Sequence, residues 1–254
     1  MTKVEQLGVF LNSSRHCVAF TGAGISTESG IPDFRSPGGV WSKTTPVMYG
    51  DFVASREQRV RYWKQRVEMY RDFADSEPNA GHDALVDLEK RGKIRAIITQ
   101  NIDGLHQIAG SQRVVEIHGT ARVVACISCG KEWTPQHVHR LIEEGDEAPD
   151  CDRCGAPLKS KTISFGQAMP EKEMLESQHL AQSADLFVSI GSSLVVEPAA
   201  SLPRIAKQHG ARLVIINRDK TPLDPTADLV IHESIGKTLT EAVSNVIASR
   251  QHGG

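Results

Sequence analysis

The sequence predicts an α/β protein: a doubly wound parallel sheet of Rossmann-like type with a smaller zinc-binding module. Three features of the sequence predict this fold. Short apolar segments recur along the chain, helical segments separate several of them, and two Cys-x-x-C pairs interrupt the alternation between the third and fourth apolar segments. Continuous apolar strands separated by helices are typical of a parallel sheet that is covered on both faces.

Six apolar segments are the predicted strands. Their short length and their lack of polar alternation indicate burial on both faces. The strands are expected at residues 16–20, 94–99, 114–118, 184–191, 211–217 and 227–232. Apolar residues spaced by three or four, and start signals such as Glu77-Pro78-Asn79, predict the helices. The helices are expected at residues 5–14, 55–75, 80–91, 198–209 and 237–249.

The two predicted parts of the molecule are discontinuous in sequence. The larger, Rossmann-like domain is expected to take residues 1–36, 81–120 and 160–254. The smaller module is expected to combine a helical segment, residues 37–80, with the cysteine-bearing segment, residues 121–159. Residues 31–50 are rich in proline and glycine and have no period, so a loop is expected there. Ligands commonly bind in the cleft between two such parts.

Composition and charge argue against several classes of protein. The 254 residues have a formal net charge of -2, with 39% hydrophobic and 24% charged residues, as in an ordinary soluble globular protein. A dedicated nucleic-acid-binding domain is usually basic, so none is expected. In the basic stretch 56–71, the pairs Glu57–Arg61 and Lys64–Glu68 indicate a solvated helix face instead. We find no membrane-spanning run and no signal peptide, so a cytoplasmic protein is expected.

Four of the five cysteines form two Cys-x-x-C pairs, Cys126 with Cys129 and Cys151 with Cys154. Each pair can bring two thiolates to one ion from a tight turn, and two pairs complete a tetrahedron around zinc. Four thiolates leave no position for water, so the predicted zinc is structural. Two redox pairs or inert thiols are the alternatives. Cys17 lies inside an apolar segment and is interpreted as a small core residue.

A Gly-x-Gly turn, Gly22-Ala23-Gly24, follows the first predicted strand and opens a predicted helix. N–H groups at such a helix start can bind a pyrophosphate. However, Thr27 replaces the third glycine of the dinucleotide-binding fingerprint, and the acidic residue expected about 20 positions later is missing. The turn alone therefore leaves nucleotide binding and a plain tight turn open, and it argues against an ordinary dehydrogenase.

Longer motifs extend over nearly the whole chain and resemble the signatures of the sirtuin family. They are GAGISTESGIPDFR at 22–35, TQNIDGLHQIAG at 99–110, EIHG at 116–119, GSSL at 191–194 and IN at 216–217. The four cysteines lie between the third and fourth signatures, as in sirtuins. The resemblance implies an NAD-dependent protein deacylase, which removes acyl groups, acetyl foremost, from lysine. Its products are nicotinamide and O-acyl-ADP-ribose.

The resemblance also implies which residues bind NAD. Gln100, Asn101 and Asp103 would line the pocket for ribose and nicotinamide, at the carboxyl end of a strand, where ligands bind in open α/β sheets. Asp33 and Arg35, whose default interpretation is a solvated loop ion pair, would lie with Phe34 over the cofactor. The implied cofactor-binding residues are Gly22, Ala23, Gly24, Ser26, Asp33, Phe34, Arg35, Gln100, Asn101, Ile102, Asp103, Gly191, Ser192, Ser193, Asn217, Arg218 and Ile235.

His118 and Asn101 are the implied catalytic residues. An imidazole with a pKa near 6.5 can take a proton from a ribose hydroxyl near neutral pH, so His118 would be the general base. A lone histidine beside an apolar strand is more often structural. Its position before Gly119, within the third signature, favours the catalytic role.

Two segments are implied to bind the acylated protein as an added strand, mainly through the main chain. They contain Ile163, Phe165 and Gly166, and Val195, Val196 and Glu197. Gln167 stands where sirtuins usually have glutamate, which leaves side-chain preference around the lysine open.

The resemblance also implies that Tyr62, Trp63 and Arg66 line the acyl channel. Sirtuins that prefer succinyl or malonyl lysine carry a Tyr-x-x-Arg pair, because a buried carboxylate needs a cation and a hydrogen-bond donor. Here Gln65 stands three residues after Tyr62, and Trp63 stands three before Arg66. Neutral acyl groups are therefore expected to be removed faster than succinyl.

Two other functions stay open at this point. One is mono-ADP-ribosyl transfer to protein, which uses the same cleavage of NAD. The other is a non-catalytic, NAD-dependent module that binds acyl-lysine, and the presence of His118 weighs against it.

Overall fold

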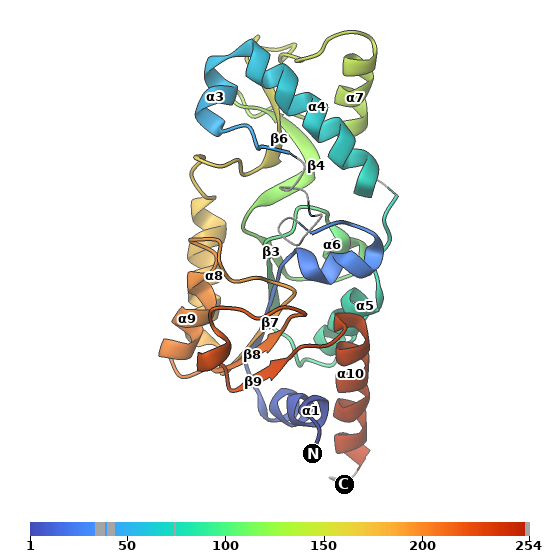
Figure 1. The fold of residues 1–254 in the computed structure, drawn as a ribbon, viewed down its shortest axis with the longest axis vertical. Coiled ribbons are helices and arrows are strands. Elements are labelled where there is room, and N and C mark those ends of the chain that lie inside the picture. Colours follow the sequence, from blue (N-terminus) through green and yellow to red (C-terminus); the bar gives the residue numbers. More distant parts are fainter. Residues whose placement is uncertain (34–38, 40–43, 74, 252–254) are drawn as a thin grey trace.

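The computed structural model describes residues 1–33, 39, 44–73 and 75–251, and it has a large layered part and a smaller part beside it (Figure 1). The N-terminus and the end of the last helix, α10 (Ile235–Gln251), lie at the end of the large part that is farther from the small one (Figure 1). Within the described residues, no helix is long and apolar enough to cross a bilayer.

A six-stranded parallel sheet forms the centre of the large part, in the order β3-β2-β1-β7-β8-β9. Its strands are β1 (Cys17–Thr21), β2 (Ala96–Thr99), β3 (Val114–Glu116), β7 (Leu186–Ile190), β8 (Arg212–Ile216) and β9 (Leu229–Ile231). The chain builds outward from β1 in one direction and from β7 in the other. The carboxyl ends of β1 and β7 therefore form a switch point, where ligands bind in sheets of this kind.

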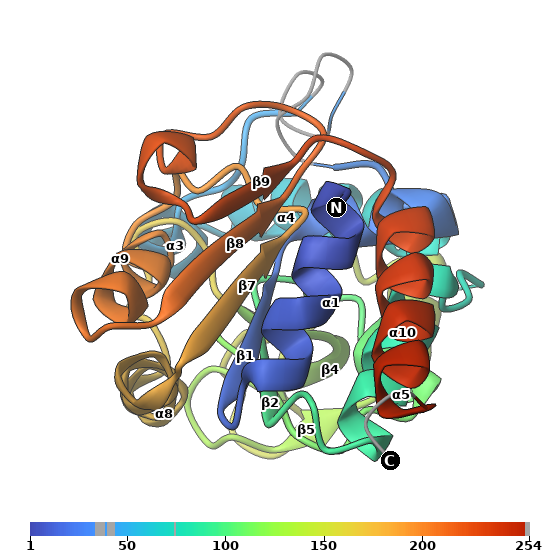
Figure 2. The ribbon, with the colours of Figure 1, turned by 90° about the horizontal axis from the view of Figure 1, so that it is seen from below.

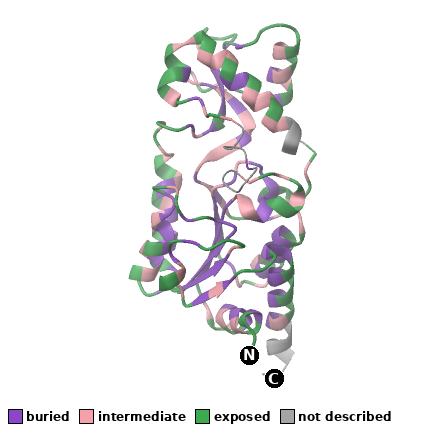
Figure 3. Ribbon diagram, viewed as in Figure 1, coloured by how far each residue is buried: buried purple, intermediate pink, exposed green. Residues whose placement is uncertain are grey.

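Helices cover both faces of this sheet (Figure 2). One face carries α1 (Lys3–Ser13), α5 (Ala80–Lys90) and α10 (Ile235–Gln251), and the other carries α8 (Glu171–Ser183) and α9 (Ser201–Gln208). Neighbouring strand residues alternate between two apolar cores: Ala19 belongs to the first and Phe20 to the second. Figure 3 shows the strands as the most continuously buried part of the molecule. This confirms the predicted doubly wound α/β fold.

The small module is built on an antiparallel sheet in the order β5-β4-β6. Its elements are α3 (Tyr49–Ala54), α4 (Arg56–Phe73), β4 (Gly119–Cys126), β5 (Glu132–Trp133), α7 (Pro135–Glu143) and β6 (Leu158–Thr162). A single apolar core joins them and includes Phe52, Trp63, Val124 and Leu158. The sheet begins at Gly119 and ends at Thr162, so it crosses the predicted boundaries at 120/121 and 159/160.

Several elements differ from those predicted. The segment after Gly22 is a 3-10 helix, η1 (Ala23–Ser29), and the third strand ends at Glu116. The sequence interpretation did not identify α6 (Leu105–Ala109), α7, α8, η2 (Asp224–Thr226) or the antiparallel sheet. Most of these elements are short or carry few large apolar residues, and α7, although amphipathic, has only 9 residues, so the sequence signal is weak. Residues 49–54, at the edge of the predicted loop, are helical because α3 packs Phe52 into the module core.

Candidate active site

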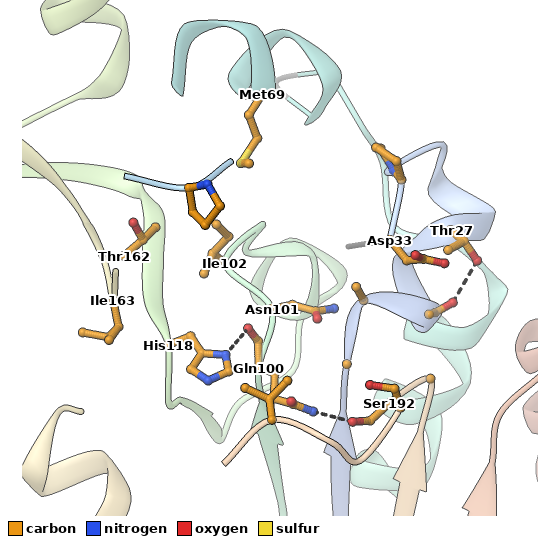
Figure 4. A pocket seen from close by; sticks show the side chains of 18 of the residues that line it. Thr27, Asp33, Met69, Gln100, Asn101, Ile102, His118, Thr162, Ile163 and Ser192 are labelled. Carbon is orange, nitrogen blue, oxygen red and sulfur yellow. Dashed lines mark hydrogen bonds between the residues drawn. The ribbon is translucent and has the colours of Figure 1, made fainter. Parts of the chain in front are cut away.

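A cavity of about 1080 Å³ opens between the carboxyl edge of the large sheet and the small module (Figure 4). Segments that are far apart in sequence line it: the turns after β1 and β7, the loop after β2, His118 between β3 and β4, the end of β6 and one face of α4. Many sequence-predicted residues meet here. They are Gly22, Ala23, Gly24, Asp33, Tyr62, Arg66, Gln100, Asn101, Ile102, His118, Ile163, Phe165, Gly166, Gly191, Ser192, Ser193, Val196, Glu197, Asn217, Arg218 and Ile235.

The floor of the cavity needs glycine because two turns touch there. The Gly24 N–H donates to Gly191 O at 2.8 Å, and a Cβ added at Gly24 would lie 2.7 Å from Gly191 Cα. Gly191 has a φ of +64°, which favours glycine, and a Cβ there would lie 2.4 Å from Ile25 N. This close contact brings the ends of β1 and β7 together. It also occupies one N–H that the sequence interpretation offered to a pyrophosphate.

His118 lies just beyond β3, and its ring faces the cavity (Figure 4). Its Nδ1 lies 3.0 Å from the main-chain oxygen of Gln100. A carbonyl oxygen can only accept, so the neutral ring carries its proton on Nδ1 and its lone pair on Nε2. The main chain of His118 is held as well, because Ile163 N–H donates to His118 O at 2.9 Å. A histidine fixed in this tautomer can act as a general base through Nε2.

Asn101 is oriented by a buried chain of hydrogen bonds. Its Nδ2 donates to Ser26 Oγ at 3.1 Å, and Ser26 Oγ donates to Asp103 Oδ2 at 2.8 Å. Asp103 Oδ1 accepts from Leu105 N at 2.9 Å. Ser26 and Asp103 do not line the cavity and lie behind Asn101. These hydrogen bonds fix the orientation of the Asn101 amide. Its Nδ2 points toward Ser26, and its Oδ1 lies on the opposite side of the amide group.

Gln100 connects the two halves of the sheet edge. Its Nε2 donates to Ser192 Oγ at 2.7 Å, and its main-chain N–H donates to Thr21 O at 3.0 Å (Figure 4). The same residue accepts from His118, as described above. The loop after β2 is therefore held to β1, to the β7 turn and to the candidate base.

The far end of the cavity is formed by segments that follow β8 and β9. Arg218 lies 3.9 Å from Asp33 across this end, and its guanidinium is largely exposed. His232 Nδ1 lies 2.7 Å from Asn217 O, and its Nε2 lies 3.3 Å from Asp224 Oδ2. The ion pair between Arg218 and Asp33 joins two residues from distant segments, both of which the sequence assigned to the cofactor site.

The α4 side of the cavity carries Tyr62, Arg66 and Met69, which the helical period places on one face. The Arg66 Cζ lies 5.1 Å from the centre of the Tyr62 ring, and the buried Lys159 Nζ lies 5.7 Å from it. Burial raises the pKa of Tyr62, but the charges of Arg66 and Lys159, together with the polar side chains of Thr162 and Arg66, lower it, so the net shift is downward. Trp63, also assigned to the acyl channel, points into the module core instead.

The two predicted peptide-binding segments flank the cavity. Phe165 is 42% exposed and Val195 is 53% exposed, which is unusual for side chains of this size. Phe165 lines the cavity, whereas Val195 does not and faces outward. Gln167 Oε1 accepts from Ser164 N at 3.1 Å, so this side chain closes its own turn.

The four clustered cysteines converge at the tip of the module, where their sulfur atoms all lie within 4.8 Å of one another. The Sγ atoms of Cys126 and Cys154 are 3.4 Å apart, and those of Cys129 and Cys151 are 3.6 Å apart. A zinc ion with Zn–S bonds of about 2.3 Å requires sulfur separations of roughly 3.8 Å. N–H groups of Ser128 and Cys129 point at Cys126 Sγ, which favours the thiolate. The cluster therefore fits one structural zinc, which would join β4 to the 151–154 turn.

Other predicted residues lie elsewhere, and other lining residues were missed. Phe34 and Arg35 lie outside the described residues. The missed lining residues are Thr27, Pro32, Thr44, Pro46, Val47, Gln65, Glu68, Met69, Thr162, Ser164, Gln167, Met169, Pro198, Asp219, Lys220, His232, Glu233 and Ser234. A signal existed for the last three, since His232 ends the sixth predicted strand and Glu233 and Ser234 directly follow it at the same sheet edge. None existed for those on α4, which depend on how the module packs.

Comparisons with known proteins agree with this geometry. A model described as the Sir2 family matches residues 22–198. The chain is 50% identical over 244 residues to NAD-dependent protein deacetylase 1 of Bradyrhizobium diazoefficiens, covering 95% of this chain and 96% of the relative. It is 51% identical over 244 residues to the NAD-dependent protein deacetylase of Rhodopseudomonas palustris, with the same coverage. A solved structure of Sir2 with a p53 peptide and NAD+ has a TM-score of 0.86 at 36% identity, covering 96% of this chain and 98% of that chain.

Proposed function

The chain belongs to the Sir2 family, and we propose that it uses NAD to remove acyl groups, acetyl foremost, from lysine side chains of proteins. One observation carries the proposal most directly. A single cavity contains both a histidine fixed with its lone pair on Nε2 and the glycine, serine and asparagine residues of the sheet edge. Base and cofactor-binding groups therefore face the same space.

In the proposed reaction, the bond between nicotinamide and ribose breaks, and nicotinamide leaves with the bonding electrons. The acyl oxygen of the modified lysine attacks the ribose carbon. His118 Nε2 takes a proton from a ribose hydroxyl, which lets that oxygen attack the acyl carbon in turn. The lysine nitrogen then takes up the proton and leaves as the free amine, and water adds to the acyl carbon, so that the acyl group stays on the sugar as O-acyl-ADP-ribose.

The remaining residues bind and orient the two substrates. Asn101 would hold the ribose and nicotinamide region with an amide that Ser26 keeps in one orientation. Ser192 and Gln100, already bonded to each other, would meet the cofactor at the switch point. The 163–166 and 195–197 segments would take the peptide between them as an added strand. The cytoplasmic location expected from the sequence stays a prediction that cell fractionation can test.

The test is an incubation of the purified, zinc-loaded protein with NAD and an acetyl-lysine peptide, followed by mass spectrometry. We expect the peptide to lose its acetyl group while nicotinamide and O-acetyl-ADP-ribose form in equal amounts. Added nicotinamide should inhibit, and NADH should not replace NAD, because only the cationic nicotinamide is a good leaving group. ADP-ribose on protein would favour transfer instead, no turnover would favour a binding module, and stoichiometric NADH would contradict the proposal.

A further inference from the structure

The loop after β2 is held in place from the zinc-bearing sheet, and we infer that Arg122 is a positioning residue for this loop and hence for NAD. Arg122 lies in β4 and carries no role in the motifs above. The loop contains Asn101, Ile102 and Asp103, the residues proposed to meet ribose and nicotinamide. The inference rests on the proposed function only in taking NAD as the ligand.

Three consecutive loop residues contact the start of β4. Ala121 N–H donates to Ile102 O at 2.9 Å, and Arg122 Nε donates to the main-chain oxygen of Asp103. Gly104 has a φ of +72°, and a Cβ added there would lie 2.4 Å from Arg122 Nε and 2.6 Å from its Cδ. The glycine thus leaves the room that the arginine side chain occupies. Together these contacts hold the loop in a fixed position against the start of β4.

The Arg122 bond fixes the peptide plane that follows Asp103. Because the Asp103 carboxylate extends from the Cα at the edge of that plane, holding the plane restrains the position from which the carboxylate reaches its partners. The carboxylate in turn accepts from Ser26 and from the Leu105 N–H. Ser26 orients Asn101, which lines the cavity. Arg122 therefore acts on the cavity through Asp103 and touches no reacting atom.

The charge of Arg122 also matches its surroundings. Burial raises the pKa of Glu116, with Asp103 adding to that effect, while Arg122 is among the groups that lower it. Arg122 is half-buried, and its Nη2 is buried without a hydrogen-bond partner in the described residues. A neutral replacement would therefore lose both the bond to Asp103 and a charge that favours the ionised form of Glu116.

The experiment uses equilibrium binding of NAD to the zinc-loaded protein, measured by calorimetry, in wild type and Arg122→Met. Methionine keeps a long, flexible side chain and removes the donor. We expect the Kd for NAD to rise by about tenfold, the scale of one lost hydrogen bond to a well-placed group. Hydrogen exchange at the Leu105 amide should become faster, because that amide is bonded to Asp103. Zinc content should stay that of wild type.

Arg140→Met is the matched control, since Arg140 is an exposed arginine on α7 of the same module. It should leave both readings unchanged. Arg122→Lys keeps the charge without the Nε donor and should fall between wild type and Arg122→Met; it replaces the methionine variant should that one fail to fold. A Kd within twofold of wild type would overturn the inference. So would weaker binding with unchanged Leu105 exchange or with lost zinc, since either means a general structural role.

Binding needs no turnover, so the two proposals can fail separately. A wild-type protein that binds NAD but leaves acetyl-lysine intact would count against the proposed function alone. A wild type that deacetylates, with Arg122→Met binding NAD normally, would count against the inference alone.

Discussion

The large domain and the small module are stabilised in different ways. The strands β1, β2, β7 and β8 are packed on both faces, and two extensive apolar cores result. The module has one small core, and two of the four clustered cysteines, Cys126 and Cys151, are members of it. Small cores rarely suffice without a metal or cross-link. The comparison indicates that the sheet-edge side of the cavity depends on apolar packing, whereas the module side depends on zinc.

The largest expected effect tests the chemistry that both regions share. His118→Ala should lower kcat by roughly 10²–10⁴-fold, the usual loss when a general base is removed. The Kd for NAD should change little, because the sheet-edge contacts remain. Deacetylation of a peptide by mass spectrometry and NAD binding by calorimetry give the two readings. A variant with near-wild-type turnover would rule out His118 as the base.

Removing one zinc ligand should separate the two regions. Cys126→Ser should release the zinc and unfold the module, because a closed four-thiolate site contributes folding free energy directly. Hydrogen exchange should then accelerate in β4 and α7 while β1 and β7 stay protected. Cys17→Ala is the control, since Cys17 is a buried β1 cysteine outside the cluster. A wild-type protein that is stable and free of zinc would contradict this division.

Acid should weaken the large domain through His106. This side chain is 1% exposed, its Nε2 lies 2.9 Å from Thr21 Oγ1, and burial, then the charge of His82, lowers its pKa to about 3. In the unfolded chain the pKa is about 6.5. The unfolded state therefore takes up the proton first as the pH falls. The contribution of His106 to the free energy of unfolding should be fully present above pH 6.5. The free energy of unfolding should drop by about 2 kcal/mol between pH 7.5 and 5.

Urea unfolding at several pH values measures this drop. His106→Asn should be less stable at neutral pH but should lose less stability on acidification than wild type does. Carboxylates contribute equally to both proteins, so the difference between the slopes isolates the histidine. Parallel slopes would mean that His106 is protonated in the folded state or titrates alike in both states.

The smallest expected effect concerns the acyl group. As the sequence predicts, kcat/KM should be higher for acetyl and butyryl peptides than for a succinyl peptide. Arg66 lines the cavity, so Arg66→Met should lower the succinyl rate further and change the acetyl rate little. The matched control is Arg61→Met, on the same helix but outside the cavity lining. A succinyl preference of more than about tenfold in wild type would reverse the prediction.

The sequence predicted the large domain better than the module, for a physical reason. Buried parallel strands are almost continuously apolar, so β7 and β8 could be recognised from residues 184–191 and 211–217 alone. The module strands lack such an apolar run. In β4 buried residues are separated by partly exposed ones, and β5 is very short. The cysteine spacing predicted the cluster because two Cys-x-x-C pairs supply all four ligands of a zinc site. Arg122 could not be found from sequence, since its role arises where two distant segments touch.

The pairing of β4 with β6 has a consequence for how the molecule can vary. Gly119 pairs with Thr162 at the cavity end, and Cys126 pairs with Leu158 at the other end of the ladder. The intervening residues 127–157 therefore begin and end at neighbouring positions of the paired strands, and they form an insertion at one end of the β4–β6 pair. Insertions or deletions between the two Cys-x-x-C pairs, for example in the exposed turn at 144–147, should shift only this inserted segment. They should leave the cavity end of the β4–β6 pair where it is. We expect insertions there to be tolerated, and related chains to differ most in length in that segment.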